Sequence, residues 1–125
     1  MLTGDKIVGE QMDVKLGDIF WISPKEANQI ASDYTHPHVV VRNDTSNTII
    51  VCALTTNLKR AKAPGNLLLE EGEANLPKQS VVVVSQVSTV DKAQLGEYIG
   101  TLTEGRINQV LAGMRFLQTM IQHHE

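Results

Sequence analysis

Three groups of residues in the 125-residue sequence have side chains that suit chemistry on phosphodiesters. His36 stands at the start of an apolar, β-branched segment, and Thr55 ends the next segment of this kind. A basic cluster of Lys59, Arg60 and Lys62 follows. An imidazole transfers protons near neutral pH, a hydroxyl hydrogen-bonds a phosphoryl oxygen, and Lys and Arg hold phosphates. If the two segments pair as a hairpin, these three groups lie near one another.

Metal chemistry has weaker support in the sequence. His36 and His38 occupy alternate positions and therefore share one strand face, but a metal site needs a third ligand. His123 and His124 stand at the end of the chain, where they are poor candidates. The sequence also has no glycine-rich phosphate loop, zinc-spaced Cys/His set or nucleophile elbow. We therefore expect neither a metal nor a cofactor.

The composition limits the class of protein. With 42% hydrophobic and 20% charged residues, the chain has ordinary globular values, and its length suits one domain. The formal net charge of −3 argues against a protein that grips nucleic acid over its whole surface, because phosphate binding depends on Lys and Arg. A local basic cluster remains compatible with that charge.

Short segments of the sequence indicate the cellular location of the protein and the state of its cysteine. The longest aliphatic run, residues 81–84, is too short to span a bilayer, and charges near the N-terminus interrupt any secretory signal. We expect a cytoplasmic protein without a membrane segment. The single cysteine, Cys52, lies in an apolar run and is expected to be an inert core residue.

Most of the chain has the sequence pattern of β-strands. Short segments rich in Val, Ile and Thr alternate with Gly, Pro and polar turn residues, and no long helix separates them. The pattern predicts strands over residues 17–23, 36–43, 48–55, 66–69, 80–84, 86–90 and 98–101. The second and third are joined by a short polar turn, which favours an antiparallel hairpin. Six or seven such strands indicate a small barrel.

The C-terminal segment has a helical period. From Thr103 onward, apolar residues recur at three- and four-residue steps as far as Ile121. Phe116 and Met120 widen the apolar arc beyond one stripe, and one barrel face does not cover it. A second copy of the chain or a partner protein would bury both residues. The alternative is a helix end with two tolerated exposed apolar side chains.

Two segments have less pattern. Residues 1–15 show weak periodicity and are expected to form an N-terminal arm, with one domain over residues 16–125. The connection over residues 23–35 is long for a hairpin, so we expect it to act as a flap.

Six short motifs occur in an order and spacing that resemble a known family. They are GDIFW (17–21), SP (23–24), VVVRND (39–44), ALTTN (53–57) before the basic loop, LPKQSV (76–81) and QVSTVDK (86–92). Over roughly residues 16–118, the chain resembles the MazF/PemK toxins of bacterial toxin–antitoxin systems. The resemblance implies an SH3-like barrel with a C-terminal helix, working as a homodimer. It also implies metal-independent, sequence-specific cleavage of single-stranded RNA that an antitoxin protein blocks.

The resemblance assigns roles to individual residues. The family's threonine after the third strand falls on Thr55, and its catalytic arginine falls on His36, so we expect these two residues to be catalytic. The RNA-binding residues are expected to be Thr56, Asn57, Lys59, Arg60, Lys62 and Ser88. Ser88 replaces a Lys or Arg of relatives, and imidazole titrates near neutrality where arginine does not.

Two functions of different classes remain open at this stage. In the first, the chain is an endoribonuclease in which His36 moves a proton and Thr55 hydrogen-bonds the phosphoryl oxygen. In the second, the barrel has lost turnover and is a protein- or RNA-binding module, with Phe116 and Met120 in the interface. In that case His36 and Thr55 have structural roles only.

Overall fold

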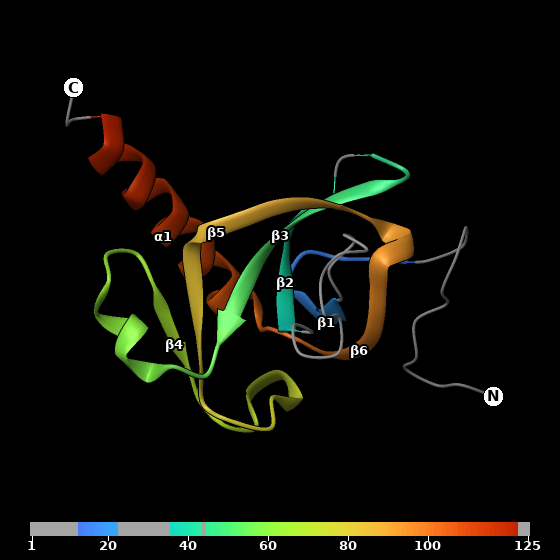
Figure 1. Ribbon diagram of the computed structural model, residues 1–125, viewed down its shortest axis with the longest axis horizontal. Coiled ribbons are helices and arrows are strands. Elements are labelled where there is room, and N and C mark those ends of the chain that lie inside the picture. Colours follow the sequence, from blue (N-terminus) through green and yellow to red (C-terminus); the bar gives the residue numbers. More distant parts are fainter. Residues whose placement is uncertain (1–12, 23–35, 44, 123–125) are drawn as a thin grey trace, which may run out of the picture.

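A computed structural model describes residues 13–22, 36–43 and 45–122 (Figure 1). The elements in chain order are β1 (Asp18–Ile22), β2 (His36–Arg42), β3 (Thr48–Thr55), the 3₁₀ helix η2 (Leu58–Lys62), β4 (Leu67–Leu69), η3 (Glu73–Asn75), β5 (Ser80–Asp91), η4 (Lys92–Gln94), β6 (Leu95–Thr101) and helix α1 (Glu104–Gln122). None of the described helices is both long and apolar enough to cross a membrane.

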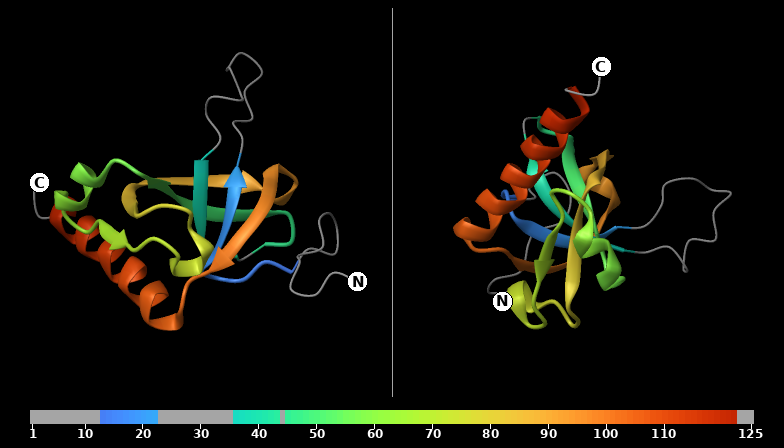
Figure 2. Two further views of the ribbon diagram at one scale, coloured as in Figure 1. Left: turned by 90° about the horizontal axis from the view of Figure 1, so that it is seen from below. Right: turned by 90° about the vertical axis from the view of Figure 1, so that its left-hand side faces the viewer.

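The described strands form one antiparallel sheet that coils on itself and carries helix α1 along one side (Figure 2). Their order is β4-β5-β3-β2-β1-β6. The expected hairpin is present, with His38 opposite Ala53 and Val40 opposite Val51 in β2 and β3. The prediction of a mainly β, barrel-like fold with a C-terminal helix is confirmed.

Strand β5 corrects one detail of the sequence prediction. The two strands expected over residues 80–84 and 86–90 are a single strand of 12 residues. Its register against β3 shifts between Cys52, opposite Val87, and Leu54, opposite Val82. Extra residues in one strand bend it and increase its twist, so β5 turns a corner where the sequence suggested a break. The first part of β5 thereby also pairs with β4.

Helix α1 begins after Thr103, whose hydroxyl oxygen accepts a hydrogen bond from the Arg106 backbone N–H at 3.2 Å. Val110 is fully buried, and the partly buried Ile107, Leu111, Met114 and Leu117 pack against the sheet. Ile121, expected on the same buried stripe, is 64% exposed. Ile121 lines the open groove between the helix and the strands, so the sheet leaves most of its side chain exposed.

Successive residues of the strands belong to two different apolar clusters. Val39 and Val41 join a cluster that includes Val110 of helix α1, whereas Val40 joins a second cluster with Phe20. This alternation is the period of two that a strand imposes on its side chains. Both faces of the central strands are therefore buried.

Cys52 lies in the first of these clusters, as predicted for an inert core residue. It is buried, and its Sγ donates a hydrogen bond to the Val83 carbonyl at 3.0 Å. Burial raises the pKa of the thiol to about 12, so the reactive thiolate is suppressed at neutral pH.

Two glycines let the basic loop approach helix α1. A Cβ at Gly113 would lie 2.2 Å from the Gly65 carbonyl oxygen, and Gly65 itself has a positive φ of 83°. Only glycine permits both the close contact and the left-handed backbone at Gly65. The segment that follows η2 is therefore held against the middle of the helix.

Several sequence expectations lie outside the described residues. They concern residues 1–12 of the expected arm, the long connection over residues 23–35, and His123 with His124. The described part of the arm belongs to the barrel, because Val14 is 4% exposed and its carbonyl accepts a hydrogen bond of 2.7 Å from the Asn43 side chain.

Candidate active site

A cavity of about 300 Å³ opens where the end of β1, the start of β2 and the end of β3 meet the segment before β5. It brings together His36 and Thr55, the two residues that the sequence analysis selected as catalytic. The described residues that line it are Trp21, His36, Pro37, Leu54, Thr55, Thr56, Leu76, Pro77, Lys78 and Ser80.

His36 is the first residue of β2 and is exposed to solvent. Its Cα pairs with Ile22 of β1, which places it at the end of the sheet. The ring of His38 holds this position, because its Nδ1–H donates a hydrogen bond of 2.9 Å to the His36 carbonyl oxygen. The imidazole of His36 therefore stands on a fixed backbone and faces the cavity.

His38 contributes structure to the site and does not line the cavity. Burial lowers its pKa from the usual histidine value, and the nearby His36 lowers it further, while the hydrogen bond to the His36 carbonyl opposes both effects. His38 is therefore a neutral donor at pH 7. The described residues include no group of three or more His, Cys, Asp or Glu residues that could hold a metal ion.

Thr55 ends β3 directly beside His36. The β2–β3 register pairs His38 with Ala53, and continuing it by two residues sets His36 next to Thr55. The Thr55 hydroxyl oxygen accepts a hydrogen bond of 3.2 Å from the Asn57 backbone N–H. Because this bond uses the oxygen as an acceptor, the hydroxyl proton can be donated to a substrate oxygen.

The basic residues stand beside the cavity and not in its wall. Asn57 starts η2, where its side-chain oxygen accepts a hydrogen bond of 3.2 Å from the Lys59 backbone N–H. Lys59, Arg60 and Lys62 then follow on this 3₁₀ helix, directly after the cavity residue Thr56. The Arg60 carbonyl accepts a hydrogen bond of 2.8 Å from the Asn66 side chain, which fixes the loop.

Ser88 lies apart from the other expected RNA-binding residues. It pairs with Val51 on β3, four positions before Thr55, which corresponds to about 13 Å along a strand. It is exposed but does not line the cavity. A ligand that touches both Thr55 and Ser88 has to extend along the sheet.

Trp21 and Lys78 also line the cavity, and neither was among the candidate site residues expected from the sequence. On β1, Ile19 is buried, whereas Trp21 is half-buried and lines the cavity. Lys78 belongs to a distant segment, and no local pattern connects it to His36. Its sequence signal was its place in the LPKQSV motif (76–81), directly before a predicted strand.

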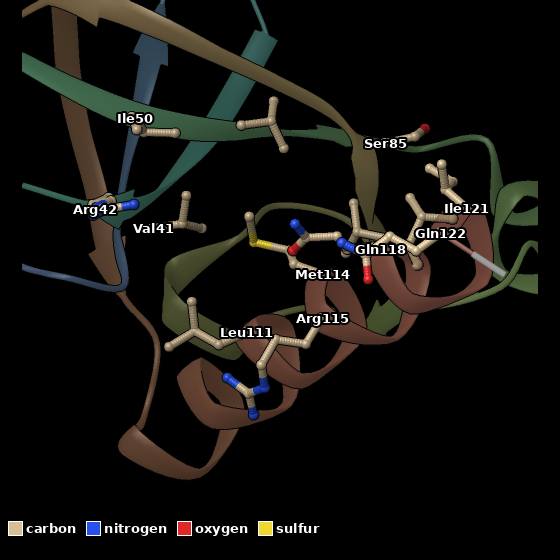
Figure 3. A pocket seen from close by; sticks show the side chains of 13 residues that line it. Val41, Arg42, Ile50, Ser85, Leu111, Met114, Arg115, Gln118, Ile121 and Gln122 are labelled. Atoms are coloured by element: carbon tan, nitrogen blue, oxygen red, sulfur yellow. The ribbon is translucent and has the colours of Figure 1, made fainter. Parts of the chain in front are cut away.

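A second, larger hollow lies between helix α1 and the strands. This groove has a volume of about 690 Å³ and is lined mainly by apolar residues such as Val41, Ile50, Leu111 and Met114. Figure 3 shows Met114 pointing from the helix into the groove, while Arg115 points away from the strands. Neither His36 nor Thr55 reaches it.

Comparisons with known proteins add evidence from sequence. Residues 15–117 match the family model described as "PemK-like, MazF-like toxin of type II toxin-antitoxin system". A curated relative from Staphylococcus epidermidis, "Endoribonuclease MazF", is 31% identical over 103 residues, which cover 78% of this chain and 84% of the relative.

Solved structures are similar in fold. An endoribonuclease in complex with its cognate antitoxin from mycobacterial species has a TM-score of 0.64 at 18% identity, over 82% of this chain and 91% of that chain. The Mycobacterium tuberculosis toxin MazF-mt6 has a TM-score of 0.62 at 16% identity, over 78% of this chain and 91% of that chain. At such low identity these likenesses concern the fold alone.

Proposed function

The chain belongs to the PemK-like, MazF-like toxins of type II toxin–antitoxin systems, and on that premise we propose that it cleaves single-stranded RNA in the cavity formed by β1, β2 and β3. It is an endoribonuclease toxin. We choose this site because His36 and Thr55, which come from different strands, line the same cavity.

The reaction is a transfer within the RNA chain. The 2′-oxygen attacks the adjacent phosphorus, a P–O bond forms there, and the bond from phosphorus to the 5′-oxygen breaks. The 2′-hydroxyl loses its proton, and the leaving 5′-oxygen gains one. The products are a 2′,3′-cyclic phosphate and a 5′-hydroxyl, with no metal or redox partner needed for the balance. DNA, which lacks the 2′-hydroxyl, is not cut.

The two cavity residues divide the chemistry between them. His36 moves a proton, because imidazole is a general acid or base at neutral pH. Thr55 donates its hydroxyl proton to a phosphoryl oxygen, since its oxygen already accepts the Asn57 hydrogen bond. Thr56 extends the same wall.

The basic residues of η2 hold the RNA beside the site of cleavage. Lys59, Arg60 and Lys62 bind flanking phosphates beside the cavity, and Asn57 fixes the start of the loop. Ser88 meets only an RNA strand that extends along β5 away from the cavity. Recognition of a short RNA sequence then depends on bases placed between these contacts.

The partners follow from the family and from exposed apolar residues. We infer a cognate antitoxin protein as inhibitor, and cytoplasmic action, where cellular RNA is available as substrate. We also infer a homodimer, because Phe116 is 53% exposed and Ile121 is 64% exposed on helix α1. Met120 was expected to be exposed like Phe116, but it is half-buried and therefore contributes less to this surface.

The test is to incubate the purified chain with a mixed-sequence RNA in the presence of a chelator and to map the fragment ends. We expect cuts at a defined short sequence, with 2′,3′-cyclic phosphate and 5′-hydroxyl ends. A DNA strand of the same sequence is the matched control and stays intact. RNA that also stays intact contradicts the proposal and favours a binding module.

A further inference from the structure

We propose that Lys78 is a catalytic residue of this endoribonuclease, with its ammonium group contacting the non-bridging oxygens of the scissile phosphate and stabilising the charge that develops in the transition state. This inference rests on the proposed function, because it assigns a role within the same cavity. The observation behind it is that Lys78 shares this cavity with His36 and Thr55.

Lys78 is distinguished by charge among the described residues that line the cavity. It is the only Lys or Arg in that lining, and no Asp or Glu is present there. Besides His36, the remaining lining residues carry hydroxyl, indole or apolar side chains. The described lining therefore has one ammonium group and no carboxylate to neutralise it.

The backbone around Lys78 is held on both sides. Pro77 restricts the chain before it, and the Ser80 hydroxyl donates a hydrogen bond of 2.9 Å to the Lys78 carbonyl oxygen. Leu76 is 2% exposed, which anchors the segment in the core. The Gln79 side chain points elsewhere, donating a hydrogen bond of 3.0 Å to Glu70 Oε1.

A second anchor ties this segment to helix α1. Arg106 donates hydrogen bonds to both carboxylate oxygens of Glu73, with Nε–Oε2 at 2.5 Å and Nη2–Oε1 at 3.2 Å. The Arg106 hydrogen bonds lower the pKa of Glu73, so the ion pair persists at neutral pH. Leu76 N–H in turn donates a hydrogen bond of 2.9 Å to the Glu73 carbonyl. Lys78 therefore projects from a fixed loop.

The Lys78 side chain itself is available for a ligand. It is exposed, and no ion pair joins it to another residue in the described part of the chain. An ammonium group offers three donors on a flexible stem, which suits a phosphate as a point charge. Nothing among the described residues has to be displaced before the ammonium binds an anion.

The reaction requires such a charge. The phosphodiester carries one negative charge, and attack by a deprotonated 2′-oxygen adds a second on the phosphoryl oxygens. Thr55 supplies a neutral hydrogen bond, and an imidazole that acts as a base has to be neutral before it accepts the proton. The three basic loop residues do not line the cavity. Lys78 is thus the one Lys or Arg of the described lining that can meet the developing charge directly.

The test compares Lys78→Gln, which removes the charge, with Lys78→Arg, which keeps it. We expect Lys78→Gln to lower kcat by about 10²-fold while KM changes by less than about threefold, because the interaction strengthens in the transition state. Lys78→Arg should recover at least a tenth of the parent kcat.

Lys92→Gln is the matched control, since Lys92 lies beyond the opposite end of β3, where Thr48 pairs with Asp91. It should retain parent kcat.

Folding and binding are checked with an RNA that carries a 2′-deoxy nucleotide at the cut site. This RNA cannot react, so a Kd within about threefold of the parent shows that Lys78→Gln is folded and binds. Should Lys78→Gln fail to fold, Lys78→Arg decides: recovery supports the inference, and a loss of 10²-fold or more in a folded protein overturns it.

The outcomes separate this inference from the proposed function. If the parent chain leaves RNA intact, the proposed function fails and the role of Lys78 fails with it. If the parent cuts RNA and Lys78→Gln keeps kcat within about twofold, or raises KM alone, the role of Lys78 is overturned while the proposed function stands.

Discussion

The cavity at the strand ends and the groove beneath helix α1 are two hollows of opposite character. The groove is larger, about 690 Å³ against about 300 Å³, and its floor and walls are mainly aliphatic. The smaller cavity combines an imidazole, hydroxyl groups and one ammonium group. A large apolar pocket is the usual first guess for a binding site, but phosphoryl chemistry depends on converging polar groups.

The volume of a hollow and the chemistry that its lining residues allow are therefore separate properties. Apolar residues at helical spacing make the groove, because helix α1 packs against the sheet over only part of its length. Strand ends make the cavity, because there backbone pairing stops and side chains of three strands become available. The groove suits a protein surface, whereas the cavity suits a phosphate.

The largest expected effect follows from His36, and it tests whether the cavity is the reaction site. His36→Ala should lower the cleavage rate by roughly 10²-fold or more, because general acid–base catalysis is lost. His36→Arg should keep some phosphate binding and remove one limb of the pH–rate profile between about pH 5.5 and 8, where arginine does not titrate. The measurement is kcat against pH for all three proteins.

The direction of that profile identifies the role of His36. A rate that falls above neutrality indicates that protonated His36 acts as the acid or holds phosphate. A rate that falls below about pH 6 indicates that neutral His36 acts as the base. If His36→Ala cuts RNA at the parent rate with the parent profile, the assignment of this cavity is wrong.

The next effect concerns the basic loop at the edge of the cavity. Replacing Lys59, Arg60 and Lys62 together by Ala should weaken RNA binding by about tenfold near physiological salt. It should also flatten the plot of log Kd against log salt by up to about one unit per lost contact. Binding of uncleavable RNA at several salt concentrations measures this. An unchanged slope would move the RNA to another surface.

Thr55→Ala should have a smaller effect, about fivefold on kcat, because it removes one hydrogen bond and no proton transfer. Thr55→Ser keeps the hydroxyl and is the matched control, with a rate close to the parent. Steady-state kinetics on a short RNA containing one cut site separates the two variants. Equal rates for Thr55→Ala and the parent would remove Thr55 from the mechanism.

A substitution at the exposed end of helix α1, which borders the groove, should change the oligomeric state and leave the stability of the fold almost unchanged. Ile121→Asp should convert a homodimer into a monomer, because it places a charge on the exposed apolar end of helix α1. The free energy of unfolding should change by less than ~0.5 kcal/mol, since Ile121 is already exposed. Light scattering and thermal melts measure the two quantities. A parent chain that is monomeric at tens of micromolar contradicts the homodimer.

Much of the fold could be predicted from local pattern. The third strand has the same bounds in sequence and structure, residues 48–55, because its β-branched run is flanked by polar turn residues. The C-terminal helix follows its apolar period and begins after Thr103 as a capping threonine requires. Local propensity and tertiary packing agree at these positions.

Prediction was less complete where a long-range contact overrides local pattern. Ser85 suggested a break between two strands, but pairing with β3 on one side and β4 on the other carries β5 through the bend. Ile121 has the helical period of a buried residue, yet it is 64% exposed and lines the open groove between the helix and the strands. Neither outcome is encoded within a few residues of these positions.

The candidate site divides in the same way. The sequence by itself determined a mainly β chain with a C-terminal helix, a buried Cys52, and the choice of His36 and Thr55 through residue chemistry and motif order. The tertiary structure decided that Trp21 and Lys78 complete the same cavity and that Ser88 stands outside it. The physical reason is that sheet register and the β5 bend bring distant strand ends together, which depends on pairing between segments and not on the residues within any one of them.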